Sequence, residues 1–387
     1  MRKYFAMNIS SKLPNLGTTI FSVMSALANK HKAINLSQGF PNFDCDERLK
    51  NLVSHYVQKG FNQYCPMTGV PILVERLAAK IHGLYQVSYD PYTEINITSG
   101  ATQAIFSTIH AFIHPNDEVI IVEPAYDCYQ PSIQLAGGKV VPYQIKAPDW
   151  KINWEEFGQL ITSKTRMIIL NTPHNPSGSI LEDSDYQALQ QLVENSNILI
   201  LSDEVYEHMI YDGKKHCSIL SYPALRQRSL AVYSFGKTLH ATGWKLGYIV
   251  ADKALMKEFR KVHQFDVFSS NTPMQYAIAD YLEDEQSYLG LPQFFQQKRD
   301  FFLDKIQDSP FQFTPSAGTY FQVADYSAIS DEPDTEFAKR MTIEYGVAVI
   351  PLSVFYHDNL DNKVVRFCFA KTEDVLANAG ALIRKIG

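Results

Sequence analysis

The sequence of 387 residues lacks several patterns that define whole classes of protein. Its 41 acidic side chains outnumber the 35 lysines and arginines, so the net charge of −6 offers no basic excess for nucleic acid or an anionic membrane surface. No apolar run reaches the length of a membrane-spanning helix, and the N-terminal residues do not form the apolar segment of a secretory signal. We therefore expect a cytoplasmic protein.

The cysteines do not form a pattern typical of a disulfide framework. There are five, at positions 45, 65, 128, 217 and 368, and no two of them form a CxxC pair. An odd, dispersed set of this kind is typical of reduced thiols, and it favours neither a disulfide framework nor a zinc site. The eleven histidines are scattered as well, and we predict no metal site.

What the chain does contain, between residues 94 and 251, is a series of short apolar runs. Seven of them are typical of strands: Ile95–Thr98, Glu118–Val122, Lys139–Gln144, Arg166–Leu170, Ile198–Leu201, Leu230–Tyr233 and Leu246–Val250. Most are rich in isoleucine and valine and show little alternation, as strands buried on both faces do. Helical patterns lie between the runs, so we predict an α/β fold with a mostly parallel seven-stranded sheet.

The pattern changes from about residue 280. Long charged helical stretches, Tyr288–Asp308 and Asp334–Tyr345, frame short strands such as Gly318–Val323 and Val364–Phe369. This mixture predicts a smaller α+β domain, which the N-terminal segment joins because it does not belong to the parallel sheet. We expect a large domain over residues 46–280 and a small domain over residues 1–45 and 281–387.

Ligands of open parallel sheets bind beyond the carboxyl ends of the strands, so the residues that follow each strand are candidates for a site. Ser99-Gly-Ala-Thr-Gln103 opens a helix, and its small residues would let backbone N–H groups face a phosphate. Tyr126, beyond the next strand, could offer its ring as a stacking surface. An ordinary strand-to-helix turn and a core tyrosine are the plain structural alternatives.

Three further polar residues lie in unusual surroundings. The prolines and glycine of Asn171-Thr-Pro-His-Asn-Pro-Ser-Gly178 make a rigid loop that presents Asn175. Asp203 ends a buried strand and so needs a cation or a protonated ring nearby, unless it forms a structural salt bridge or a helix cap. Arg366 lies in an apolar strand and suits a carboxylate ligand, unless it pairs with an aspartate or glutamate of the chain.

The segment Ser234-Phe-Gly-Lys-Thr-Leu-His-Ala-Thr-Gly-Trp-Lys245 joins two of the predicted strands. Lys237 lies just past a strand end in a tight polar loop, where burial and the neighbouring Lys245 would favour its neutral amine. A neutral amine can form an imine with an aldehyde. Taken together, the strand-end residues suit a phosphorylated aromatic aldehyde that forms an imine with an amino acid.

Four motifs make the chain resemble the class I and II aminotransferases of fold type I, which use pyridoxal 5′-phosphate (PLP). They are Asn171-Thr-Pro-His-Asn-Pro-Ser-Gly178, Ser202-Asp-Glu-Val-Tyr206, Ser234-Phe-Gly-Lys237 with Gly243-Trp-Lys-Leu-Gly247, and Val365-Arg-Phe367. Within that family, the loops at residues 35–43, 63–69 and 351–355 are most similar to the branch of methionine and kynurenine–glutamine aminotransferases.

The resemblance implies a role at the cofactor for each candidate. Lys237 would carry PLP as an imine and then act as base and acid for the proton that moves in the reaction. Asp203 would keep the ring nitrogen protonated, so that the ring is an electron sink. The other expected PLP contacts are Gly100, Ala101, Thr102, Ser234 and Lys245 at the phosphate, Asn175 and Tyr206 at the phenolic oxygen, and Tyr126 on the ring face.

The resemblance also implies how substrates bind. Arg366, helped by Asn175 and the backbone of Gly39, would hold the α-carboxylate. The candidates for the side-chain pocket are apolar and aromatic: Phe21, Tyr64, Tyr126 and Phe268. Tyr64 would reach the phosphate of a neighbouring subunit, which implies a homodimer with shared active sites.

The implied reaction is a ping-pong transamination between an L-amino acid and a 2-oxo acid. Methionine is the favoured donor, followed by phenylalanine, tyrosine, leucine and glutamine, because we find no second arginine suited to a dicarboxylate. A C–S β-lyase on the same fold is an alternative, since both reactions share the imine. A ligand-sensing regulator is a third possibility, but it would need a DNA-binding domain, which we do not expect before residue 35.

Overall fold

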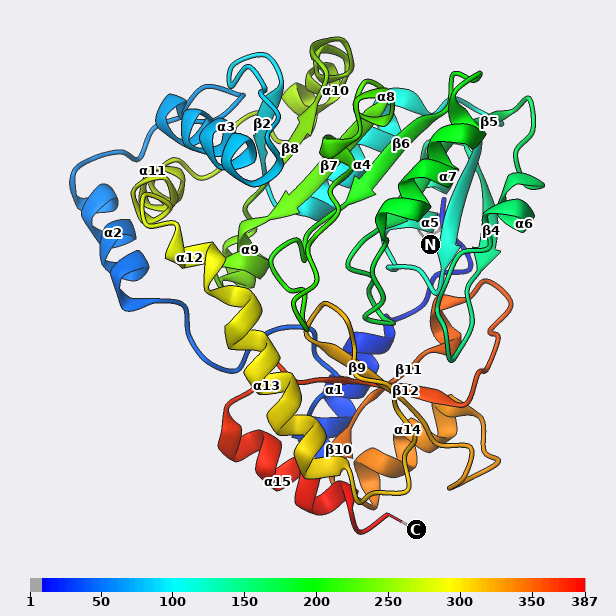
Figure 1. Ribbon diagram of the computed structural model, residues 1–387. Helices are drawn as coiled ribbons and strands as arrows, with labels where there is room; N and C mark the ends of the chain where they lie inside the picture. Colours follow the sequence, from blue (N-terminus) through cyan, green and yellow to red (C-terminus); the bar gives the residue numbers. More distant parts are fainter. Residues whose placement is uncertain (1–8, 387) are drawn as a thin grey trace, which may run out of the picture.

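The computed structural model describes residues 9–386 and has a large α/β body above a smaller one (Figure 1). The large body contains one seven-stranded sheet in the order β2-β8-β7-β6-β5-β3-β4. Its strands are β2 (Ile95–Thr98), β3 (Glu118–Glu123), β4 (Lys139–Gln144), β5 (Thr165–Asn171), β6 (Leu199–Asp203), β7 (Ser229–Ser234) and β8 (Gly247–Ala251). Only β8 runs antiparallel to its neighbours, β2 and β7, so the expected mostly parallel sheet is confirmed.

The sheet is buried on both faces. Ile120 and Ile168 pack into one hydrophobic cluster, whereas the next residues along each strand, Ile121 and Ile169, pack into another. This two-sided burial explains why the strand sequences alternate so little. The covering helices are α3 (Pro71–Tyr85), α4 (Ala101–Phe112), α5 (Tyr129–Leu135), α6 (Trp154–Gly158), α7 (Asp183–Val193), α8 (Pro223–Arg226), α10 (Lys253–Asp266) and α11 (Thr272–Tyr281).

The smaller body combines both ends of the chain. Its sheet has the order β11-β12-β9, from β11 (Ile350–Pro351), β12 (Val364–Cys368) and β9 (Phe321–Asp325). The N-terminal β1 (Ile34–Asn35) pairs with β10 (Val347–Ala348), and α1 (Ile20–His31) packs against α14 (Asp334–Ile343). The N-terminal segment therefore lies with the C-terminal one, while the domain limits at residues 46 and 280 stay a prediction.

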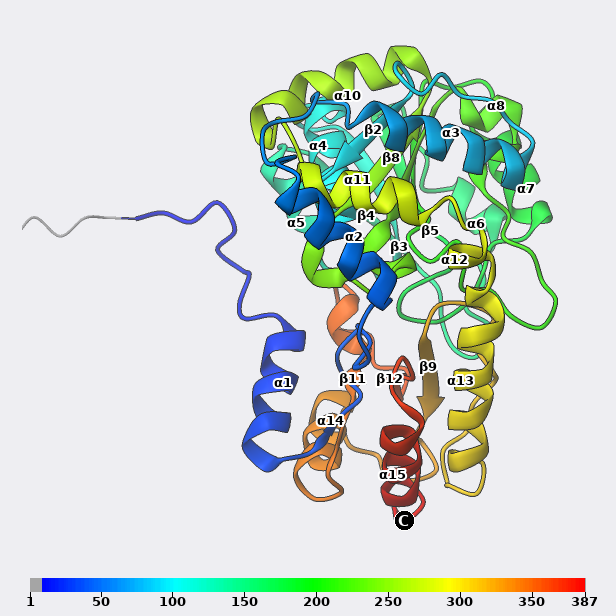
Figure 2. The same ribbon diagram turned by 90° about the vertical axis from the view of Figure 1, so that its left-hand side faces the viewer.

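Helix α13 (Leu291–Ile306) runs from the large body down the smaller one, where it packs against α15 (Glu373–Ile383) (Figures 1 and 2). The single helical stretch expected from residue 288 is divided, because a short α12 (Gln286–Leu289) ends at Gly290 before α13 begins. Pro292 explains the new start, since proline has no N–H to donate and suits the first turn of a helix.

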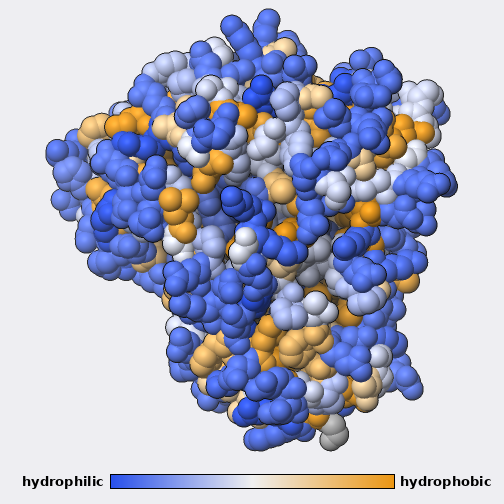
Figure 3. Space-filling view, in the orientation of Figure 1, coloured by the Kyte–Doolittle hydropathy of each residue, from blue (hydrophilic) through white to orange (hydrophobic). Residues whose placement is uncertain are grey.

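The remaining short elements are α2 (Glu47–Gln58), which packs against α11, the one-turn helix α9 (Phe235–Thr238), and the 3₁₀ turns η1 (Ile219–Ser221), η2 (Thr242–Trp244) and η3 (Ser353–Phe355). No helix of the described residues is long and apolar enough to span a membrane. The face shown in Figure 3 is mostly hydrophilic, with smaller hydrophobic areas between.

Candidate active site

The residues expected at the strand ends meet around one cavity of ≈ 140 Å³. The cavity lies where β5, β6 and β7 end and α4 begins. Ten of the residues expected at the cofactor line it: Gly100, Ala101, Thr102, Tyr126, Asn175, Asp203, Tyr206, Ser234, Lys237 and Lys245. Segments that are far apart in the sequence thus form one cavity.

One end of the cavity is built to hold an anion. Helix α4 begins beside Gly100, whose φ is +82°, and no side chain caps its first N–H groups. Gly247 makes the close approach possible, because a Cβ there would lie 3.0 Å from the nitrogen of Ala101. The side chain of Lys245 passes beside Gly100, and Ser234 lines the same cavity. Free N–H groups, an ammonium and a hydroxyl suit a phosphate.

Lys237 lies on the one-turn helix α9, where we expected a tight polar loop. The turn closes directly after β7, where Leu239 N donates to the carbonyl of Phe235 at 2.7 Å. Lys237 Nζ donates to Tyr320 Oη at 2.7 Å and to the carbonyl of Gly39 at 3.1 Å. These contacts direct the amine into the cavity from the end of β7.

Burial lowers the pKa of Lys237 to about 8. The positive charges of Arg366 and Lys245 act in the same direction, whereas Cys368 and Asp203 oppose them. Lys245 therefore lowers the pKa of Lys237, as expected, but burial lowers it more. An amine that loses its proton near neutral pH is suited to attack an aldehyde carbon.

Asp203 is buried and lines the same cavity. Tyr129 Oη donates to its Oδ2 at 2.6 Å, and no ion pair involves Asp203 among the described residues. Burial raises the pKa of Asp203 to about 6. The salt-bridge alternative is thus not observed, and the carboxylate keeps the capacity to accept a proton from a ring nitrogen.

Arg366 is only 1% exposed, yet it pairs with no acid in the part of the chain that the structure describes. Its Nη1 donates to Asn175 Oδ1 at 2.7 Å and its Nη2 to the carbonyl of Ser37 at 3.1 Å. Its Nε is buried without a hydrogen-bond partner. Burial lowers the pKa of Arg366 to about 10. A planar carboxylate would satisfy this guanidinium.

The aromatic candidates occupy different positions. Tyr126 lines the cavity, and Phe21 lies beside Arg366, whose guanidinium carbon is 5.4 Å from the centre of its ring. Tyr64 is 82% exposed and packs edge-on against Phe268 outside the cavity lining. Gly39, expected at the α-carboxylate, presents its carbonyl to Lys237, and Ser37 supplies the backbone contact to Arg366 instead.

Sequence reasoning missed two tyrosines that orient the site. Tyr129 lies one turn after Tyr126, and this spacing could have drawn attention to it. Tyr320 comes from the smaller body, just before β9, and no local pattern marks it. Both side chains are buried, and their hydroxyls contact Asp203 and Lys237 respectively.

The geometry defines a class of protein. An anion site, a buried proton acceptor and an amine of lowered pKa line one cavity, and they match the phosphate, ring nitrogen and aldehyde of PLP. An arginine free to bind a carboxylate lies beside them. This arrangement at the strand ends of an α/β sheet is that of a PLP-dependent enzyme acting on amino acids.

Comparison with known proteins agrees. Residues 31–382 match the family described as aminotransferase class I and II. The chain is 48% identical to methionine aminotransferase of Escherichia coli over 377 residues, which cover 97% of this chain and 98% of that protein. It is 34% identical to human kynurenine–oxoglutarate transaminase 1 over 394 residues, which cover 93% of each chain.

Solved structures give the same result. The crystal structure of Escherichia coli YbdL, described as having a methionine aminotransferase function, has a TM-score of 0.96 at 48% identity, over 98% of this chain and 100% of that one. N-succinyldiaminopimelate aminotransferase of Mycobacterium tuberculosis has a TM-score of 0.94 at 32% identity, over 98% and 100%. The chain therefore belongs to the class I and II aminotransferases, which depend on PLP. The expected family, fold class and cofactor are confirmed.

The pKa of Lys237 leads to a prediction for the apoenzyme. Only the neutral amine attacks an aldehyde, so the rate of covalent PLP attachment should rise with pH and level off above about pH 8. Stopped-flow absorbance after mixing apoenzyme with PLP would give the profile. Lys237→Ala is the control and should give no covalent absorbance change. A midpoint near the ordinary lysine value, about 10.4, would contradict the proposed burial of this amine.

Proposed function

We propose that this protein transfers the amino group from an L-amino acid with an apolar, thioether or aromatic side chain, above all methionine, to a 2-oxo acid. The observation that carries the proposal is the buried guanidinium of Arg366, fixed by Asn175 beside the cavity and without an acidic partner. The 48% identity to the methionine aminotransferase of Escherichia coli supports methionine as donor.

The surroundings of Arg366 support an apolar substrate side chain. The centres of two phenylalanine rings lie near its guanidinium carbon, Phe321 at 3.9 Å and Phe21 at 5.4 Å. Among the described residues, those that line the cavity include Lys237 and Lys245 but no arginine. A dicarboxylate would leave its second carboxylate without a guanidinium, whereas a thioether or aromatic group would pack on Phe21, the ring that is not fully buried.

Each side chain has a proposed task in this reaction. PLP, when bound, supplies the electron sink for the pair released at the substrate Cα. Arg366 and Asn175 hold the α-carboxylate, and Lys237 takes and returns the proton at its Nζ. Tyr320 and the Gly39 carbonyl orient that amine. Asp203, oriented by Tyr129, holds the proton of the ring nitrogen.

A panel of L-amino acids with a single 2-oxo acid acceptor tests the reaction and its substrate together. We expect new amino acid from the acceptor, with methionine giving the highest kcat/KM and aspartate a low one. Cystathionine is included in the panel as a further substrate, and free ammonia is measured in every sample. Ammonia and pyruvate in place of new amino acid would show the β-lyase, and aspartate as the best donor would refute the apolar specificity.

Arg366→Lys keeps the charge but loses the planar fork. We expect KM to rise for amino acid and oxo acid alike, with kcat/KM falling about 10- to 100-fold, because hydrogen bonds to a charged group are worth about 1.5–3 kcal/mol. The PLP dissociation constant should stay unchanged. Steady-state kinetics and a PLP titration would show both. A loss of PLP with unchanged KM would place Arg366 at the phosphate instead.

The proposal includes a homodimer with shared active sites and a cytoplasmic location. Tyr64 and Phe268 support the dimer, because two exposed aromatic rings in contact favour burial against a second copy. Tyr64 would reach the phosphate of PLP in the neighbouring subunit. The five unpaired cysteines support the reducing cytoplasm.

Mixing two inactive variants tests the shared site. Lys237→Ala removes the amine, and Tyr64→Ala removes the contact to the neighbour's phosphate. If the sites are shared, a mixed dimer has one site with both residues intact, so activity should rise after the variants are unfolded and refolded together. Separately refolded variants mixed at the end are the control. Activity no higher than that control would mean that each chain completes its own site.

A further inference from the structure

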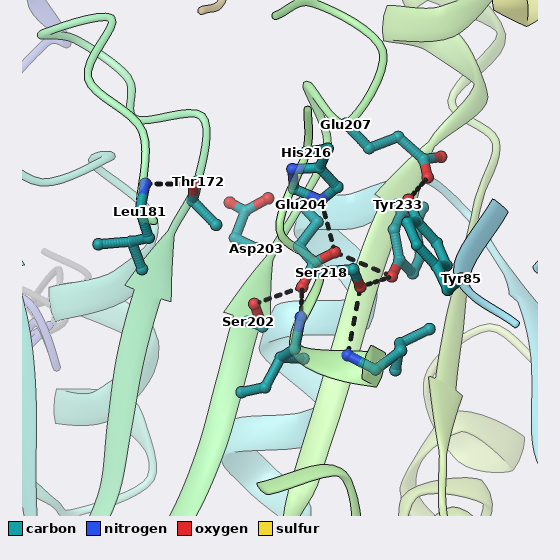
Figure 4. A network of polar contacts seen from close by, with 12 residues as sticks. Tyr85, Thr172, Leu181, Ser202, Asp203, Glu204, Glu207, His216, Ser218 and Tyr233 are labelled. Carbon is teal, nitrogen blue, oxygen red and sulfur yellow. Dashed lines mark hydrogen bonds and ion pairs between the residues drawn. The ribbon is translucent and has the colours of Figure 1, made fainter. Parts of the chain in front are cut away.

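A second carboxylate lies directly behind Asp203. Glu204 is the next residue of the chain and is fully buried, at 0% exposure. Neighbouring residues at a strand end point to opposite sides, so Asp203 faces the cavity while Glu204 faces a separate polar network. Figure 4 shows the two carboxylates pointing in different directions, with Glu204 directed at Tyr233 and His216. Nothing in the proposed reaction uses Glu204.

Four donors hold the carboxylate of Glu204. Ser202 Oγ and the Ile219 backbone nitrogen donate to Oε1 at 2.8 and 3.0 Å. His216 Nε2 and Tyr233 Oη donate to Oε2 at 2.8 and 3.0 Å. The two oxygens are therefore fully engaged, and the position of the side chain is set from β6, β7, η1 and the loop before η1 (Figure 4).

None of the four donors around Glu204 is a lysine or an arginine. His216 contacts Glu204 through Nε2, and its Nδ1 is buried without a hydrogen-bond partner. Lys80, a buried lysine, pairs with Glu207 at 2.6 Å. Each oxygen of Glu204 accepts two hydrogen bonds, as a carboxylate does, and no lysine or arginine pairs with it among the described residues.

The other titratable groups that face Glu204 do not offset its charge. Burial raises the pKa values of Tyr85, Tyr186, Tyr233 and Tyr248, so these phenols stay neutral. A carboxyl group buried without a lysine or arginine partner is costly, and an amide of the same shape could occupy the site at lower cost. The functional group closest to Glu204 in the chain is the carboxyl group of Asp203, the preceding residue.

The backbone couples the two carboxylates. The carbonyl of Asp203 accepts from Thr172 N at 3.0 Å and from Asn171 Nδ2 at 2.9 Å, and Glu204 N donates to the Val232 carbonyl at 2.9 Å. The end of β6 is thus fixed on both sides, and the side chain of Glu204 adds a tie to η1. Asp203 cannot reorient without disturbing this network.

We propose that Glu204 is a positioning residue that fixes Asp203 and adds negative charge behind it, so that the proton between Asp203 and the PLP ring nitrogen is held more tightly. The proposal rests on the role proposed for Asp203. Two anions on one side of the ring favour its protonated form by Coulomb attraction. A ring that keeps its proton is the stronger electron sink.

The test uses holoenzyme reconstituted with PLP that carries an isotopic label at the ring nitrogen, read by NMR across a pH series. Glu204→Gln keeps the shape and removes the charge. We expect the ring nitrogen to lose its proton about one pH unit lower, a roughly ten-fold loss of proton affinity. The PLP dissociation constant should rise by up to the same factor. An unchanged ring-nitrogen titration would overturn the proposal.

The paired substitution Lys80→Met with Glu207→Gln is the matched control. It removes an equally buried carboxylate together with its own cation, three residues further along the chain. It should leave the ring nitrogen unchanged, and an equal shift would show a general effect of disturbing this region. If Glu204→Gln does not fold, Glu204→Ala removes the same charge, leaves room for water at the four donors, and should give a shift in the same direction. No shift in that variant would also overturn the proposal.

Asp203→Asn separates this inference from the role of Asp203 itself. We expect that variant to lose ring-nitrogen protonation. If it does and Glu204→Gln has no effect, only the inference about Glu204 is wrong. If Asp203→Asn leaves the ring nitrogen protonated, the proposed role of Asp203 is wrong, and the inference about Glu204 fails with it.

Discussion

Desolvation of unlike charges around one small cavity is the constraint on which the rest of this structure depends. Burial lowers the pKa of Lys237 to about 8 and that of Arg366 to about 10, and it raises the pKa of Asp203 to about 6. Each shift moves the group toward its neutral form. A ligand that brings a phosphate, a ring nitrogen and a carboxylate supplies the missing partners, which is why PLP and an amino acid fit this cavity.

The chain meets this constraint with neutral donors and acceptors rather than with internal ion pairs. Tyr129 holds Asp203, Tyr320 holds Lys237, and Asn175 holds Arg366. An internal salt bridge at any of these groups would occupy the atoms that the ligand needs. The neutral partners fix the geometry of these groups and leave their charge available to the ligand.

The seven-stranded sheet and most of the residues at the carboxyl ends of its strands could be predicted from the sequence. The seven apolar runs became β2 to β8 with ends shifted by at most two residues, because buried strands and their flanking turns are local patterns. Asp203, Asn175 and Lys237 could be proposed as site residues because each follows such a run. The one-turn helix at Lys237 was missed, since four residues are too few to show helical periodicity.

The sequence by itself determined which side chains stand at the carboxyl ends of the strands, since alternation and length define a strand and its end. The tertiary structure alone decided which distant segments meet them. Gly39 and Tyr320, separated from Lys237 by 198 and 83 residues, reach its amine only because the smaller body packs against the end of the sheet. The packing of the smaller body against the sheet depends on the shape and burial of two surfaces that exist only after each body has folded. No local sequence pattern encodes it.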